Sequence, residues 1–166
     1  SAGDRIVCTR AVYGSTRNLM TGLLARLGVT TVFVDPTDLH AVREALAVPT
    51  RVLYLETISN PTLVVGDLPA LAALGHAAGA TVVVDNTFAS PWVCRPAEHG
   101  ADLVVESATK WLGGHSDVIA GVVGGSAARI AAVRAVSIDS GGIVAPFSAF
   151  LVLDRKSTRL NSSHRT

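Results

Sequence analysis

The chain has 166 residues, of which 49% are hydrophobic and 16% charged, with a formal net charge of +1. This composition is typical of a globular core about one domain long and excludes a largely disordered chain. No basic stripe is present and no apolar run approaches the ~20 residues of a spanning helix, so we expect neither nucleic-acid nor membrane binding.

Apolar, β-branched runs alternate along the chain with Ala- and Leu-rich stretches, which is the pattern of strands joined by helical crossovers. In chain order, the predicted elements are strand 5–9, helix 16–27, strand 30–34, helix 39–47, strand 51–55, helix 68–78, strand 81–84, strand 103–106, strand 119–123 and helix 127–136. The strands lack polar alternation, so both faces should be buried, as in a mainly parallel sheet covered by helices. We predict a three-layer α/β domain over residues 1–153.

The helix ends agree with this assignment. Asp38 and Asp67 are placed to cap the helices that follow them. Gly79 stands where the helix before strand 81–84 should end.

Both ends of the sequence predict an incomplete chain. Ser1 is not an initiator Met and is followed closely by a strand, so we expect an upstream element to be missing. After an apolar helix that ends at Leu153, residues 154–166 are polar and aperiodic and resemble the in-frame translation of a sequencing-library adapter. We expect this tail to be non-native. The alternative is a genuine polar tail, and the nucleotide sequence decides between them.

The two cysteines, Cys8 and Cys94, have neither the spacing of metal ligands nor the density of a secreted disulfide scaffold. We therefore predict reduced thiols, no metal site and a cytoplasmic location.

Polar residues follow four of the predicted strands, at the sheet edge where functional groups gather in such folds. They are Tyr13 to Thr16, Glu56 to Pro61, Asp85 to Thr87 and Ser107 to Lys110. Four loops are thus expected to converge on one rim.

Asp85 ends a wholly apolar strand, where a carboxylate is costly to desolvate unless a cation or hydrogen-bond donors meet it. A turn aspartate satisfied by backbone N–H groups is the alternative. Lys110 lies among small residues, where an amine can lose its solvent shell and act as a nucleophile. Ser107 and Thr109 would project to one side of an extended segment, so their hydroxyls could hold one anion. An amine, an acid and two hydroxyls together meet the needs of pyridoxal phosphate.

The segments around these residues resemble the signature segments of the Cys/Met metabolism (trans-sulfuration) pyridoxal-phosphate enzymes. They are Tyr13 to Thr16, Glu56 to Thr62, Val84 to Pro91, Ser107 to Lys110 and Gly114 to Gly121, and the resemblance spans residues 3–153. It implies the aspartate-aminotransferase-like (fold type I) architecture. This chain would be the central part of the cofactor-binding large domain, truncated at both ends.

The resemblance also implies how pyridoxal 5′-phosphate is held. Lys110 binds it covalently and later moves protons at the α and β carbons of the substrate. Asp85 keeps the pyridine nitrogen protonated. Ser107 and Thr109 bind the phosphate.

Three further residues are implied to face the cofactor ring. Asn60 approaches the 3′ oxygen, with a simple Asn-Pro turn as the alternative. Tyr13 stacks on one face and can take part in proton transfer, with a core aromatic as the alternative. Thr87 packs against the other face.

The run Gly114 to Gly121 resembles cystathionine γ-synthases and γ-lyases more than sulfhydrylases. It implies γ-elimination or γ-replacement at the C–S bond of a small amino-acid substrate. Ser15 stands where methionine-cleaving members often have cysteine, and methionine γ-lyase or O-acetylhomoserine sulfhydrylase remain alternatives. From another class, a nucleotide-binding α/β module would need a Gly-rich turn after the first strand, where only Gly14 is present.

The family further implies a homo-oligomer, a dimer of dimers, in which a neighbouring subunit and an upstream segment complete the phosphate site. An arginine in a C-terminal domain would hold the substrate carboxylate. We therefore expect the polypeptide as given to be inactive by itself.

Overall fold

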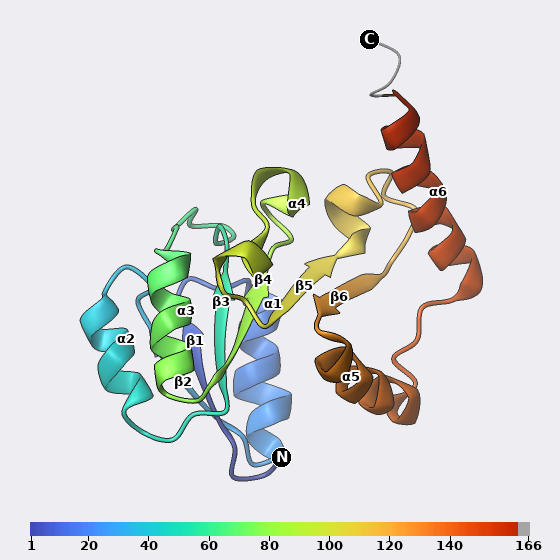
Figure 1. Ribbon diagram of the computed structural model, residues 1–166. Coiled ribbons are helices and arrows are strands. Elements are labelled where there is room, and N and C mark those ends of the chain that lie inside the picture. The colour runs from blue at the N-terminus through green and yellow to red at the C-terminus, as the bar shows by residue number, and fades with distance from the viewer. Residues whose placement is uncertain (163–166) are drawn as a thin grey trace.

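The computed structural model describes residues 1–162, with side chains as far as Asp154. A six-stranded sheet of order β2-β1-β3-β4-β5-β6 forms its centre (Figure 1). The parallel strands are β1 (Arg5–Thr9), β2 (Thr30–Val34), β3 (Val52–Glu56), β4 (Thr81–Asp85) and β5 (Leu103–Ser107). The last strand, β6 (Gly121–Gly125), pairs antiparallel with β5. The predicted α/β class with a mainly parallel sheet is confirmed.

The long helices are those that the sequence predicts, although for α6 the sequence predicted only an apolar helix that ends at Leu153. They are α1 (Gly14–Asn18) with its π-helical continuation η1 (Leu19–Leu24), α2 (Leu39–Leu46), α3 (Leu68–Ala77), α5 (Ala127–Ser140) and α6 (Pro146–Ser162). Three short turns were not predicted, namely α4 (Ser90–Val93), η2 (Pro96–His99) and η3 (Ala108–Leu112). Such short turns hold too few positions for a hydrophobic period to show.

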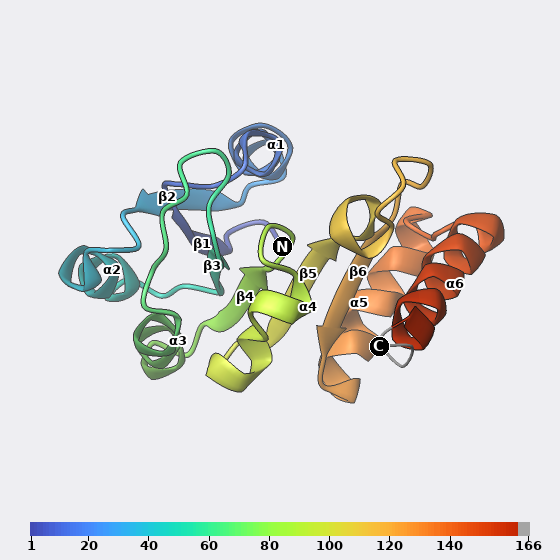
Figure 2. The ribbon, with the colours of Figure 1, turned by 90° about the horizontal axis from the view of Figure 1, so that it is seen from above.

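Helices lie on both faces of the first four strands, with α1 on one side and α2 and α3 on the other (Figure 2). Between the sheet and α2 and α3 lies the larger core, which includes Val42, Leu53, Leu71 and Val82. A smaller core of Cys8, Val12 and Met20 lies under α1 and η1. The three-layer arrangement is therefore present where the strands are most apolar.

The predicted helix ends are also confirmed. The Asp38 carboxylate accepts hydrogen bonds from two N–H groups of α2, and Asp67 accepts one from Ala70 of α3. Gly79 follows α3 with φ of 72°, a left-handed conformation that glycine adopts without a steric penalty. Both cysteines are free thiols, Cys8 buried and Cys94 partly exposed.

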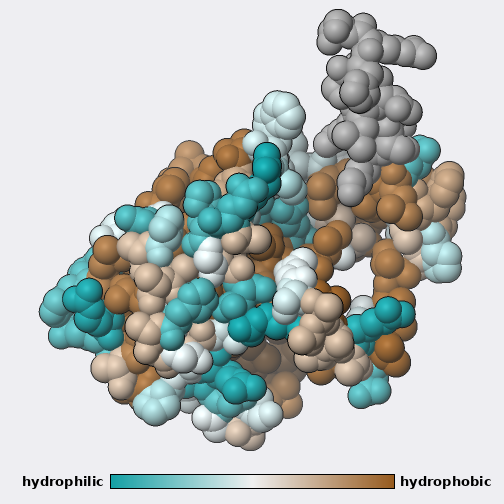
Figure 3. Space-filling model, viewed as in Figure 1, coloured by the Kyte–Doolittle hydropathy of each residue, from teal (hydrophilic) through white to brown (hydrophobic). Residues whose placement is uncertain are grey.

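The prediction that every strand is buried on both faces is wrong for β6. Each of its residues is exposed, and three of the five are glycines that offer no side chain to bury. Several apolar side chains in the segment after it are exposed (Figure 3). They are Val136 and Ile138 of α5, Ile143 of the loop that follows, and Phe147, Phe150 and Leu153 of α6.

The predicted tail, 154–166, lies partly outside the described residues, which end at 162. Its described backbone continues α6 through the predicted boundary after Leu153 as far as Ser162. The non-native origin of the tail stays a prediction. Within residues 1–162, no helix combines the length and the apolar character needed to cross a membrane.

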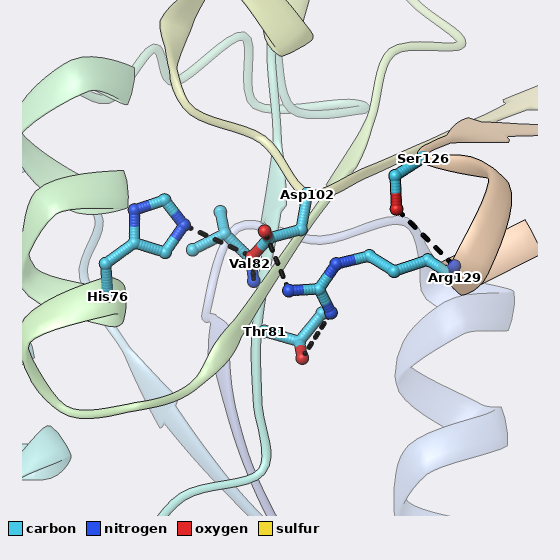
Figure 4. Close-up of polar contacts among 6 residues, drawn as sticks. All are labelled: His76, Thr81, Val82, Asp102, Ser126 and Arg129. Atoms are coloured by element: carbon cyan, nitrogen blue, oxygen red, sulfur yellow. Dashed lines mark hydrogen bonds and ion pairs between the residues drawn. The ribbon is translucent and has the colours of Figure 1, made fainter.

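A polar cluster at the amino ends of β4 and β5 attaches α5 to the sheet (Figure 4). The guanidinium of Arg129 donates to Asp102 Oδ1 at 2.9 Å and to Thr81 Oγ1 at 3.0 Å. Asp102 Oδ2 also accepts the Val82 N–H at 2.8 Å and lies 3.2 Å from His76 Nε2. Burial raises the pKa of Asp102, but these hydrogen bonds and the charge of Arg129 outweigh it and hold the pKa below its ordinary value.

Asp102→Asn is expected to lower the free energy of unfolding by about 1–3 kcal/mol at neutral pH, because it weakens three contacts at once. The folded-state pKa lies below the ordinary 3.8, so this stabilisation is present above pH 3.8 and is lost as the pH falls through the folded value. Urea unfolding of both proteins from pH 7 to pH 3 measures it. Glu98→Gln, which breaks an exposed pair with Arg95, is the control and should cost at most about 1 kcal/mol. A difference independent of pH would contradict the assignment.

Candidate active site

Asp85 is the last residue of β4, and its carboxylate is held by two donors. Oδ1 accepts the Thr87 N–H at 2.9 Å, and Oδ2 accepts the Tyr54 hydroxyl at 3.2 Å. Burial raises the pKa of Tyr54 far above its ordinary value, and the neighbouring carboxylate of Asp85 raises it further. The phenol therefore stays protonated and acts as a donor to Asp85.

A cavity of about 480 Å³ opens beside this carboxylate, a volume within the ~300–1,000 Å³ usual for small-molecule sites. Its lining includes Asp85, Thr87 and Ser107, together with residues of the segments 119–123 and 141–144. Asp85 is in register with Val105, so Ser107, two residues further along β5, projects to the same face of the sheet. The Ser107 N–H donates to Thr87 Oγ1 at 2.8 Å, which joins the two residues.

Lys110 and Thr109 lie in η3, because the extended segment ends at Ser107. Thr109 Oγ1 accepts the Ala120 N–H at 3.0 Å and lies 3.3 Å from the Ala120 oxygen, so this hydroxyl is bonded to the chain leading into β6. The expectation of two parallel hydroxyls on an extended strand is therefore not what the backbone shows. The Lys110 side chain is exposed, and its φ of −91° and ψ of −119° place a kink in the turn.

Two glycines after Lys110 occupy positions where a side chain would be strained or would clash. A Cβ on Gly113 would lie 2.6 Å from the Ala108 oxygen, so only glycine permits this close packing. Gly114 has φ of 73°. Lys110 is also the only lysine within residues 1–153, the second one in the sequence being Lys156. It is therefore the only lysine amine that this part of the chain can offer to a ligand.

Tyr13 and Asn60 lie on two further loops at the same sheet edge, and both side chains are exposed. Their backbone N–H groups donate to the two oxygens of Glu56, at 2.8 and 3.2 Å. Burial raises the pKa of the Glu56 carboxyl, the two N–H groups oppose this, and the charge of Asp85 adds to the increase.

A second polar group lies on the opposite face of the same strand ends. The buried Asn86 amide donates to Glu106 Oε1 and to the Cys94 carbonyl, each at 2.9 Å, and accepts the Thr57 hydroxyl at 2.7 Å. Burial raises the pKa of Glu106. These contacts join the ends of β3, β4 and β5 behind Asp85.

The structure thus brings three of the predicted residues to one cavity, namely Asp85, Thr87 and Ser107. The other four, which lie outside the cavity lining on segments that follow β1, β3 and β5, are Tyr13, Asn60, Thr109 and Lys110. The sequence did not single out Tyr54 or the bridging role of Glu56. Their alternation along β3 places both on one face, but only the register with β4 shows that this face is that of Asp85.

The family model for "Cys/Met metabolism PLP-dependent enzyme" matches residues 1–158. The chain belongs to this family. The predicted resemblance is thereby confirmed, and the cofactor of the family is pyridoxal phosphate.

Individual relatives agree with this assignment. The chain is 42% identical to an L-methionine γ-lyase of Porphyromonas gingivalis, with 91% of this chain and 39% of the relative covered. It is 39% identical to a cystathionine γ-lyase of Bacillus subtilis, covering 92% and 41%. A cystathionine β-lyase of Lactococcus lactis is 40% identical, covering 92% and 40%.

Among solved structures, the cystathionine γ-lyase of Lactobacillus plantarum complexed with L-serine superposes with a TM-score of 0.90 at 40% identity. The match covers 93% of this chain and 41% of that one. The chain therefore spans about two fifths of the length of these proteins.

The residues present fit pyridoxal phosphate. The Asp85 carboxylate, oriented by Tyr54 and Thr87, faces a cavity of suitable size and could hold a protonated pyridine nitrogen. Ser107 lines the same cavity, and its hydroxyl is a group that can bind a phosphate. Lys110 follows Ser107 closely and offers the amine.

The contact between Tyr54 and Asp85 predicts a measurable coupling. Tyr54→Phe removes the donor to Oδ2 and is expected to lower the free energy of unfolding by about 1–2 kcal/mol. In the Asp85→Asn background the same substitution should cost less, because the charged acceptor is gone. Urea unfolding of the four proteins of this double-mutant cycle gives the coupling energy. Strict additivity of the two substitutions would show that the phenol does not support the carboxylate.

Proposed function

We propose that the protein is a pyridoxal-phosphate enzyme of sulfur amino-acid metabolism that acts on C–S bonds by γ-elimination or γ-replacement, of the cystathionine γ-synthase or γ-lyase type. The observation that supports it most directly is the Asp85 carboxylate, oriented by two donors beside a cavity at the rim that holds Lys110. The names of the similar proteins, γ-lyases and a β-lyase acting on methionine or cystathionine, support the substrate class.

Four residues are proposed to bind the cofactor and to move protons. The Lys110 amine would bind the cofactor covalently, and the same amine would take the α proton of the substrate and return a proton further along it. Asp85 holds the proton on the pyridine nitrogen, and the cofactor then supplies an electron sink for the α carbon. Ser107 and Thr109 donate to the phosphate. The Thr109 hydroxyl also bonds to the Ala120 backbone, so it would have to make both interactions.

Three residues are proposed to border the ring. Tyr13 stacks on one face and offers its hydroxyl for proton transfer near the leaving group. Thr87, fixed by the Ser107 N–H, packs against the other face. Asn60 approaches the 3′ oxygen from the loop after β3.

Methionine γ-lyase is the second candidate, favoured by the 42% identity to the Porphyromonas gingivalis enzyme. Ser15 opposes it only weakly. Membership of the family removes the support for a nucleotide-binding module. O-Acetylhomoserine sulfhydrylase remains a further alternative within the family.

The assembly and location are also proposals. We infer a dimer of dimers in the cytoplasm, which is consistent with the extensive exposed apolar surface of α5 and α6. An isolated chain of residues 1–166 is expected to be inactive and prone to aggregation. Residues 154–166 are still proposed to be a non-native tail.

The first test is the visible absorbance of the lysine-bound cofactor in the full-length protein. Lys110→Ala is expected to abolish this band, because no other lysine lies within residues 1–153. Arg43→Ala, which removes an exposed cation on α2, is the control and should leave the band unchanged. Survival of the band in the Lys110 variant would remove this residue from its proposed role.

The second test identifies the reaction. With L-cystathionine, γ-elimination should release 2-oxobutanoate, ammonia and cysteine, whereas β-elimination would release pyruvate, ammonia and homocysteine. With L-methionine, γ-elimination should release methanethiol in place of cysteine. Formation of cystathionine from an O-acylated homoserine and cysteine, with release of the carboxylic acid, identifies the replacement reaction. Pyruvate as the sole keto acid would contradict a γ-specific enzyme.

A further inference from the structure

Glu56 joins two loops that are distant in sequence. Its Oε1 accepts the N–H of Tyr13, which precedes α1, and its Oε2 accepts the N–H of Asn60 in the loop after β3. Each carboxylate oxygen thus holds one loop, so the side chain acts as a bridge between them. Hydrogen bonds from N–H groups to an ionised carboxylate are about twice as strong as those between neutral groups.

The position of Glu56 is costly for an acidic residue. It is half-buried at the end of an apolar strand, and it stands directly in register with Asp85 on the neighbouring strand. Two carboxylates facing each other across a strand pair repel, and burial adds a desolvation cost. The raised pKa of the Glu56 carboxyl agrees with this cost. Such a departure from local preference is expected where function requires it.

The two bridged loops have few other anchors at the bridged residues. Tyr13 is the N-cap residue of α1 and makes no side-chain capping bond, and its own N–H donates to Glu56. The second loop is closed internally, since Ser59 Oγ accepts the Val64 N–H at 2.7 Å and the Leu63 N–H donates to the Ser59 oxygen. These bonds close the loop on itself, and the Asn60 N–H is the group through which Glu56 binds it.

We propose that Glu56 is a positioning residue that holds the Tyr13 and Asn60 segments in one fixed arrangement across the cofactor site. The proposal rests on the proposed function for the identity of the ligand, and on the two hydrogen bonds alone for the bridge. Glu56 itself does not line the cavity beside Asp85. It acts through the ring-facing residues of the two loops.

The bridge is tested without cofactor by hydrogen–deuterium exchange of the cofactor-free full-length protein. Glu56→Gln has only one acceptor oxygen and presents an amide to the other N–H, so exchange in at least one of the two segments should become about tenfold faster or more. Glu44→Gln, on the exposed face of α2, is the matched control and should change neither segment. Unchanged exchange in both segments would overturn the proposal.

Spectroscopy and kinetics of the loaded enzyme test the positioning. Glu56→Gln should keep the absorbance of the lysine-bound cofactor but lose most of its visible circular dichroism, which depends on how the ring is held. We expect kcat to fall between about tenfold and a hundredfold, with a smaller change in KM. Wild-type values of kcat and circular dichroism in a variant with lower thermal stability would reduce Glu56 to a structural residue and overturn the proposal.

A second variant and the wild-type cofactor band distinguish failure of the bridge from failure of the proposed function. Glu56→Asp keeps the charge but is one methylene shorter, so it should hold only one of the loops and serves if the Gln variant does not fold. A wild-type protein that lacks the cofactor band would refute the proposed function, while the exchange measurement would still decide whether Glu56 bridges the loops.

Discussion

The chemistry of this domain depends on one negative charge at the end of an apolar strand. Asp85 is the last residue of the apolar strand β4, where an isolated carboxylate would be strongly destabilising. The hydroxyl of Tyr54 and the N–H of Thr87 each satisfy one of its oxygens, so the orientation of the carboxylate is fixed. A carboxylate held in this way is suited to stabilise a cation in the adjoining cavity, as a protonated pyridine nitrogen would be.

Around this charge, polar groups are separated onto the two faces of the sheet. Tyr54 and Glu56 lie with Asp85 on the face of the site, whereas Asn86 and Glu106 join the strand ends on the opposite face. The alternation of side chains along parallel strands in register produces this division. The contacts on the opposite face join the strand ends, and those on the face of the site join the loops beside the cavity.

The part of the chain after β6 is organised differently. α5 is attached to the sheet by the guanidinium of Arg129, which reaches Asp102 and Thr81 at the edge remote from the site. Beyond this contact, α5 and α6 expose apolar side chains. Such exposure is consistent with a chain that spans about two fifths of its relatives' length. The cavity beside Asp85 is bounded on that side by residues 141–144, so the placement of α5 also affects the shape of the site.

The sequence alone determined the fold class, the family and the cofactor. Unbroken apolar strands, helix caps such as Asp38, and ordered motifs around Asp85 and Lys110 were enough for the α/β class, the family and the cofactor, because these depend on local pattern. Tertiary structure decided the rest. That Tyr54 supports Asp85, that Glu56 bridges two loops, and that the Thr109 hydroxyl bonds to the Ala120 backbone all depend on strand register and on the path of the chain after Ser107. Register arises from packing between segments distant in sequence, and no local pattern specifies it.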